Sequence, residues 1–220
     1  MSEFRLLTQR VGLIGLVSLF TGLSGVIMLP ILSKNMPLAD FGVWAQINVT
    51  IGLISTLMLI GLPDALTRFA AAAKSREELQ EHFYTIFSLI LASGTAVALL
   101  MLLFSDSLAS ALFDGKVAIT KILPLILLLH SLNTFLSYYF RTVQQMKIYS
   151  IFTTLTTALD IILVSGFVLA GQGIYGAVIA LLISRFVLFL VMLYWAYQAY
   201  QGQDIRIPMI TDFIHNQGWA

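Results

Sequence analysis

Two formal charges, Asp160 and Arg185, lie near the middle of consecutive apolar segments, where a charge is costly. Gly171 and Gly173 mark a turn between these segments: Asp160 lies 11 residues before Gly171, and Arg185 lies 12 residues after Gly173. If two helices fold back at this turn, both charges lie about 17 Å from it, at the same depth. A guanidinium group in a low dielectric binds phosphate or carboxylate oxygens through paired donors. The two charges therefore predict either a structural ion pair between the helices or a contact with a charged substrate.

A stripe of polar residues lies on the preceding apolar segment. Its members fall within an arc of about 100° on one side of a helix: His130, Asn133, Thr134, Ser137 and Arg141. His130 lies at the predicted depth of Asp160 and Arg185, and the stripe continues from there toward one helix end. These seven residues predict a water-accessible cavity that opens toward the cytoplasm and contacts a substrate; the alternative is hydrogen bonding between packed helices.

The composition indicates which elements must position these residues. Hydrophobic residues make up 59% of the 220, charged residues make up 10%, and the mean hydropathy is +0.91. An ordinary soluble domain has about 25% charged residues, so the chain is predicted to be an integral membrane protein. The net charge of +1 and the lack of a dense basic run argue against nucleic-acid binding. With no cysteine and no clustered ligands, the sequence predicts no metal site and no cofactor.

Six apolar windows are long enough to cross a bilayer, and each must be a helix because a lone segment in lipid has to satisfy its own backbone. The windows are residues 11–32, 41–62, 83–104, 119–140, 148–170 and 174–197. Ser75 and Glu78 in the second linker match a capping box, which predicts the start of a helix there. We therefore expect an all-α fold in which residues 1–200 form a six-helix transmembrane bundle. Residues 201–220 are expected to form a cytoplasmic tail or a truncated linker.

The basic residues outside these windows predict the orientation of the chain. Eight lie on the side that also holds both termini: Arg5, Arg10, Arg68, Lys74, Arg76, Arg141, Lys147 and Arg206. Three lie on the other side: Lys34, Lys116 and Lys121. Because basic loops remain in the cytoplasm, both termini are predicted to be cytoplasmic.

Three stretches at the helix boundaries resemble those of a known family. They are PILSKNMPLADFGVW at residues 30–44, GLPDALTRF at residues 61–69 and GQGIYGA at residues 171–177. The sequence is similar here to the polysaccharide and O-antigen flippases of the multidrug/oligosaccharidyl-lipid/polysaccharide exporter superfamily. The resemblance covers all six predicted spans.

The resemblance implies a non-enzymatic transporter of the bacterial inner membrane, active in O-antigen and lipopolysaccharide biosynthesis. Its substrate would be an oligosaccharide linked to undecaprenyl pyrophosphate, moved by alternating access of two helical bundles. Members have twelve or more helices, so this chain looks like the N-terminal bundle of a two-bundle transporter. Its expected partners are the lipid-linked oligosaccharide, membrane lipids and a coupling ion.

Within this interpretation, Arg185 and His130 would present positive charge to a pyrophosphate or an acidic sugar. Asp160 would tune Arg185 or take part in ion coupling. An intramembrane acid also suits a cation-coupled drug or small-molecule exporter of the same superfamily, which is the main alternative. A membrane-embedded transferase would need a positioned acid or base near a loop, and none is evident in the sequence. A purely structural membrane subunit is a further alternative.

Overall fold

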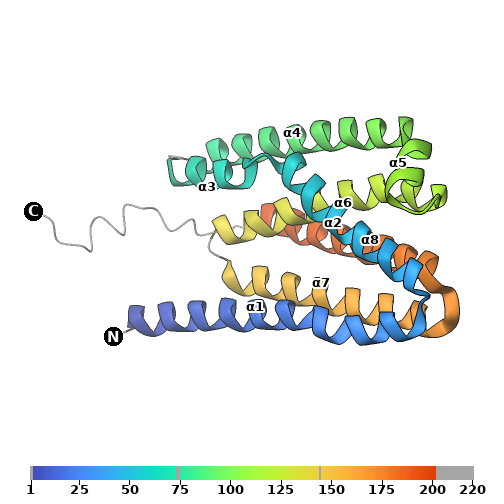
Figure 1. The fold of residues 1–220 in the computed structure, drawn as a ribbon. Coiled ribbons are helices and arrows are strands. Elements are labelled where there is room, and N and C mark those ends of the chain that lie inside the picture. The colour runs from blue at the N-terminus through green and yellow to red at the C-terminus, as the bar shows by residue number, and fades with distance from the viewer. Residues whose placement is uncertain (1, 73–74, 144, 202–220) are drawn as a thin grey trace, which may run out of the picture.

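The computed structural model describes residues 2–72, 75–143 and 145–201, and this part of the chain contains helices and no strand. The helices run in the order α1 (Ser2–Asn35), α2 (Leu38–Leu59), α3 (Leu62–Ala72), α4 (Arg76–Leu103), α5 (Ser105–Leu112), α6 (Val117–Thr142), α7 (Met146–Phe167), the π-helix η1 (Val168–Gln172) and α8 (Gly173–Gln201) (Figure 1). The all-α prediction is confirmed. Apart from Gln201, the predicted tail at residues 201–220 lies outside the described residues.

Five helical stretches in the described part of the chain are long and apolar enough to span a membrane, so this is a multi-pass membrane protein. They are Ile14–Asn35, Leu38–Leu59, Glu81–Leu103, Val117–Thr142 and Met146–Ala196. The last stretch has 51 residues and contains both of the final two predicted windows. It is not straight, because α7 and α8 fold back on each other (Figure 1).

The turn between α7 and α8 depends on two glycines. Gly171 has a φ of 80° and Gly173 has a φ of 59°, a region in which a side chain would be strained. Gln172, between them, packs its side chain against Gly176. A Cβ added at Gly176 would lie only 2.4 Å from the Gln172 Cβ. The turn predicted at these glycines is therefore present, in the form of a π-helical turn followed by a reversal.

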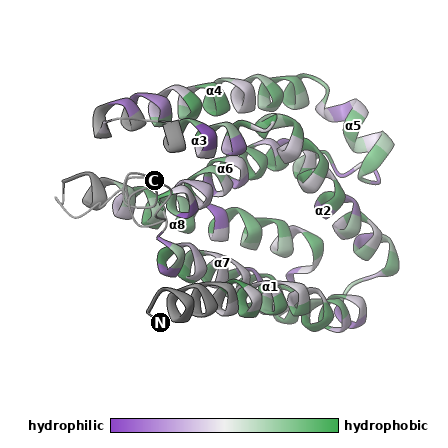
Figure 2. Ribbon diagram, turned by 90° about the vertical axis from the view of Figure 1, so that its left-hand side faces the viewer, coloured by the Kyte–Doolittle hydropathy of each residue, from purple (hydrophilic) through white to green (hydrophobic). Residues whose placement is uncertain are grey.

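The helices form three layers around α6. In the middle layer, α6 packs against α2 and α8, with α3 and α4 on one side and α1 and α7 on the other (Figures 1 and 2). The most apolar 18-residue window of α6 is 67% buried, whereas that of α1 is only 6% buried. Helix α1 packs mainly along α7. Hydrophobic residues occur along the length of the long helices (Figure 2). The polar stripe predicted on residues 130–141 thus belongs to the central helix.

The connection between α2 and α4 differs from the sequence prediction. The window expected to reach residue 62 ends at Leu59, because Ile60 and Gly61 adopt left-handed conformations with φ of 42° and 69°. A short helix, α3, follows and was not predicted, since a segment of 11 residues with polar positions gives no membrane signal. The helix start predicted at Ser75 is confirmed: the Ser75 hydroxyl accepts a hydrogen bond of 3.2 Å from the Glu78 amide.

At the end of the bundle that holds the α7–α8 turn, Lys116 joins two connections. Its Nζ lies 3.1 Å from Asp114 Oδ2 and 3.3 Å from Asp40 Oδ1. The hydrogen bond with Asp114 raises the pKa of Lys116 above its ordinary value, with Asp40 adding to the effect. This contact ties the start of α2 to the turn that precedes α6.

Candidate functional site

A cavity of about 640 Å³ lies among five helices, and residues of α1, α2, α6, α7 and α8 line it. Its wall is mainly apolar and carries seven Ser and Thr hydroxyls. We call this set the hydroxyl wall: Thr21, Ser24, Thr134, Ser137, Thr153, Thr156 and Thr157. Because these helices lie in candidate membrane spans, the cavity places polar groups at membrane depth. Irregular or polar groups at that depth are tolerated where they face protein or a cavity.

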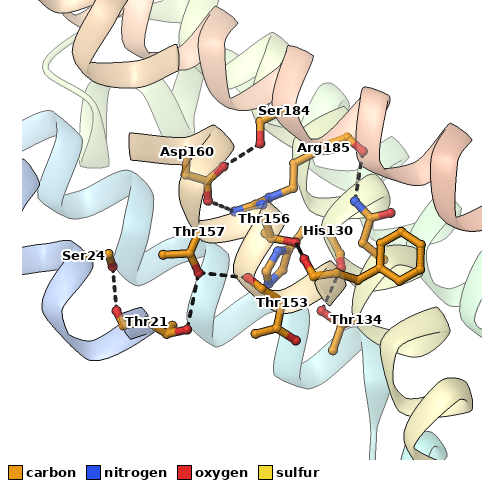
Figure 3. Close-up of polar contacts among 12 residues, drawn as sticks. Thr21, Ser24, His130, Thr134, Thr153, Thr156, Thr157, Asp160, Ser184 and Arg185 are labelled. Carbon is orange, nitrogen blue, oxygen red and sulfur yellow. Dashed lines mark hydrogen bonds and ion pairs between the residues drawn. The ribbon is translucent and has the colours of Figure 1, made fainter. Parts of the chain in front are cut away.

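The two charged candidates meet at this cavity. Arg185 Nη2 donates to Asp160 Oδ2 at 2.7 Å, and Ser184 Oγ donates to the other carboxylate oxygen, Oδ1, at 2.6 Å (Figure 3). Both charged side chains are largely buried, with exposed fractions of 9% for Arg185 and 19% for Asp160. The contact joins α7 to α8. The ion pair that was one of the two sequence alternatives is thus present in the structure.

Asn133 connects the central helix to this pair. Its Nδ2 donates to the backbone oxygen of Arg185 at 2.9 Å, which links α6 to α8. Three buried polar atoms here have no hydrogen-bond partner among the described residues: Asn133 Oδ1, Arg185 Nε and Arg185 Nη1. The site therefore holds more hydrogen-bonding capacity than the protein itself uses.

The predicted polar stripe on α6 divides into two parts. His130, Asn133, Thr134 and Ser137 all line the cavity together with Asp160 and Arg185. Arg141 is exposed and is not among the lining residues; its guanidinium carbon lies 5.9 Å from the ring centre of Tyr138, which does line the cavity. Six of the seven candidates are thus brought together, and the seventh lies beside the cavity wall.

The hydroxyl wall presents mainly acceptors to the cavity, because at least six of its seven protons are already donated within the protein. On α6 and α7, five hydroxyls donate to the backbone carbonyl four residues earlier, at 2.8 to 3.1 Å: Thr134, Ser137, Thr153, Thr156 and Thr157. Ser24 donates to the Thr21 carbonyl at 2.6 Å. The hydroxyls of Thr21 and Thr157 lie 3.3 Å apart, and either of them can donate this hydrogen bond (Figure 3). A hydroxyl that donates its proton keeps only lone pairs for other partners.

The α1 and α2 side of the cavity was not assigned from the sequence. Thr21 and Gly25 come from α1, and Trp44 and Asn48 come from α2. The small residues of α1 are equally typical of a face that packs against another helix, and Trp44 lies within an apolar run, so neither indicates a cavity from the sequence. The sequence does indicate the α7 side of the cavity. Four polar residues of α7 share one helix face by their spacing: Thr153, Thr156, Thr157 and Asp160.

The fold and the cavity define a class: a multi-pass helical membrane protein with a cavity that holds polar groups among its spans. A model of the polysaccharide biosynthesis protein family matches residues 7–216. The chain therefore belongs to this family, whose members are generally transporters or flippases rather than enzymes. Comparison with curated proteins and with solved structures found no significant match.

Proposed function

We propose that this chain moves a lipid-linked oligosaccharide or polysaccharide precursor across the bacterial inner membrane by alternating access. The observation that carries the proposal is the cavity with its hydroxyl wall, in a chain that belongs to a polysaccharide biosynthesis family. A lipid-linked sugar has an apolar tail that can stay in the bilayer and a polar head that cannot cross it unaided. The cavity offers that head hydrogen-bonding partners at membrane depth. The expected lipid carrier is undecaprenyl pyrophosphate.

The proposal includes six membrane crossings. As a straight helix, the 51-residue stretch Met146–Ala196 would be about 76 Å long, against about 30 Å for the hydrocarbon core. We infer that it crosses twice, with its turn at Gly171 and Gly173. The eight-to-three distribution of basic residues then supports cytoplasmic termini.

Alternating access requires a second body that moves against this one. We propose that the six helices form one bundle of a two-bundle transporter, in which the cavity side faces the second bundle. The low burial of α1, at 6% of its most apolar window, supports this arrangement because α1 lines the cavity and has few neighbours.

In this account the six candidate residues at the cavity line the path of the polar head. The Asp160–Arg185 pair holds α7 and α8 in register at the cavity wall. Arg141 lies at the edge of the path, beside Tyr138. None of these residues acts as a catalyst in the proposal, which involves no covalent step.

Deletion of the gene tests the proposed function. We expect the cells to lose the surface polysaccharide and to accumulate its lipid-linked precursor in the inner membrane, and a plasmid copy should reverse both effects. Resistance to cationic dyes should not change. Normal surface polysaccharide in the deletion strain would contradict the proposal, and a loss of dye resistance would favour the cation-coupled exporter instead.

A further inference from the structure

We propose that the cavity binds the uncharged sugar portion of its substrate, through the sugar hydroxyl protons, and discriminates against phosphate groups. This inference rests on the proposed function for the identity of the substrate. It differs from the sequence-based expectation that Arg185 and His130 face a pyrophosphate. The juxtaposition of a neutralised guanidinium with a wall of hydrogen-bond acceptors carries it.

Among the described residues that line the cavity, Asp160 and Arg185 are the two that carry a formal charge, and their signs cancel. Arg185 Nη2 is occupied by Asp160 at 2.7 Å, and Ser184 holds the second carboxylate oxygen at 2.6 Å. An anion that approached Arg185 would have to displace this carboxylate or lie close to it. Like charges close together at low dielectric repel strongly, so the pair disfavours phosphate.

At least six of the seven protons of the hydroxyl wall are donated within the protein, so the wall offers mainly lone pairs to a ligand. Ionised phosphate has acceptors and no donor, and it cannot use such a wall. A sugar has several O–H donors on each ring. The buried Asn133 Oδ1 is a further acceptor without a partner among the described residues. The unpartnered donors at the same place, Arg185 Nε and Nη1, belong to the guanidinium whose charge the Asp160 carboxylate already compensates.

Trp44, Tyr138 and Tyr149 lie at the cavity with the hydroxyl wall. Ligand sites typically combine aromatic surfaces with a small number of placed polar groups that fix orientation. A sugar ring has C–H faces and hydroxyl edges, so it matches both features. A pyrophosphate matches neither.

The intrinsic fluorescence of Trp44 provides the test. The chain has three tryptophans, so Trp195→Phe and Trp219→Phe leave Trp44 as the single reporter at the cavity. The purified full chain is titrated with the free oligosaccharide released by mild acid from the cell's own lipid-linked precursor, and separately with inorganic pyrophosphate. We expect a saturable change with the oligosaccharide, at the same Kd in low and high salt because no net charge is involved. Pyrophosphate should produce no change.

Two threonine variants test the acceptor wall. Thr153→Val and Thr156→Val each remove one acceptor at nearly constant volume, and each should weaken oligosaccharide binding by about fivefold, the loss of roughly one hydrogen bond. Thr95→Val is the matched control, because Thr95 makes the same kind of bond, to the Leu91 carbonyl at 2.7 Å, on α4 outside the cavity. It should leave the Kd unchanged.

Two results would overturn the inference: pyrophosphate binding that Arg185→Gln abolishes, or no response to the oligosaccharide in a folded protein. Neither result would by itself refute transport, which the deletion strain tests separately. Conversely, oligosaccharide binding in a chain whose deletion leaves the surface polysaccharide intact would preserve the inference and refute the function.

Discussion

At the contact between Asp160 and Arg185, each buried charge is compensated by the other, so the two residues should be coupled in stability. Removing one partner of a buried pair leaves an unpaired charge. We expect Asp160→Ala or Arg185→Ala to cost about 3 kcal/mol, the lower end of the range for buried pairs, because the Asp160 side chain is 19% exposed. Asp160→Asn combined with Arg185→Gln should cost less than either alanine substitution.

Thermal unfolding of the purified variants in detergent measures this coupling. Ser107→Ala, at an exposed position on α5, is the control: it should unfold at the same temperature as the unaltered protein. The contradicting result is a double variant that loses as much stability as the sum of the losses in Asp160→Ala and Arg185→Ala. In that case the two residues would act independently, and the pair would have no structural role.

At this residue scale, the distances of the two charges from the glycine turn predicted that they lie at the same depth, and the ion pair was one of the two alternatives that this left open. The surrounding contacts were not predictable. Ser184 reaches Asp160, and Asn133 reaches the Arg185 carbonyl, only because α8 is rotated to present these groups. Helical spacing gives the face of one helix and does not give its rotation against a neighbour. Arg141 shows the same limit, since it shares the α6 stripe and lies outside the cavity lining.

Among the helices, α4 approaches α6 closely at Gly94. A Cβ at this position would come within 2.6 Å of Leu128 Cδ1 and 2.8 Å of Met58 Cε. Both atoms are the ends of flexible side chains that can move aside, so we expect Gly94→Ala to lower the stability by only about 1 kcal/mol, the lower end of the range for overpacking. Gly166→Ala on α7, where nothing lies within 4 Å of the added Cβ, should cause no loss. Equal melting temperatures for the two purified variants would contradict this account of the packing.

The elements themselves were largely predictable from apolar length, because a segment in lipid has few alternatives to a helix. Two features were not. The short α3 lacks a membrane signal, and α2 ends at Leu59 because Ile60 adopts a left-handed conformation that its β-branched side chain does not predict. The position of α6 at the centre of the bundle also depends on tertiary packing that a single sequence does not encode in any local pattern.

For the whole molecule, six crossings predict a definite pattern of accessibility. The chain has no cysteine, so single substitutions at exposed positions report sidedness directly. Lys147→Cys, near the start of α7, should react with a membrane-impermeant maleimide only in inverted vesicles. Leu169→Cys, at the α7–α8 turn and 62% exposed, should react only from the outside of intact cells, as should Ser107→Cys. Labelling of Lys147→Cys and Leu169→Cys from the same side would contradict a double crossing.

The central claim is that the polar head of a lipid-linked sugar passes through the cavity among α1, α2, α6, α7 and α8. Gly25 lines this cavity, and a Cβ added there meets no atom within 4 Å, so we expect Gly25→Phe to place its ring in the path. Gly22, three residues earlier on α1, is also open but is not among the lining residues, and Gly22→Phe is the matched control.

The decisive measurement is the rate at which each purified protein, reconstituted in liposomes, moves a fluorescent lipid-linked oligosaccharide from one leaflet to the other. We predict that the unaltered chain and Gly22→Phe transport the lipid well above the protein-free rate, whereas Gly25→Phe falls to that rate while keeping its melting temperature. Transport by Gly25→Phe at the rate of the unaltered chain, or no transport by the unaltered chain, would contradict the claim.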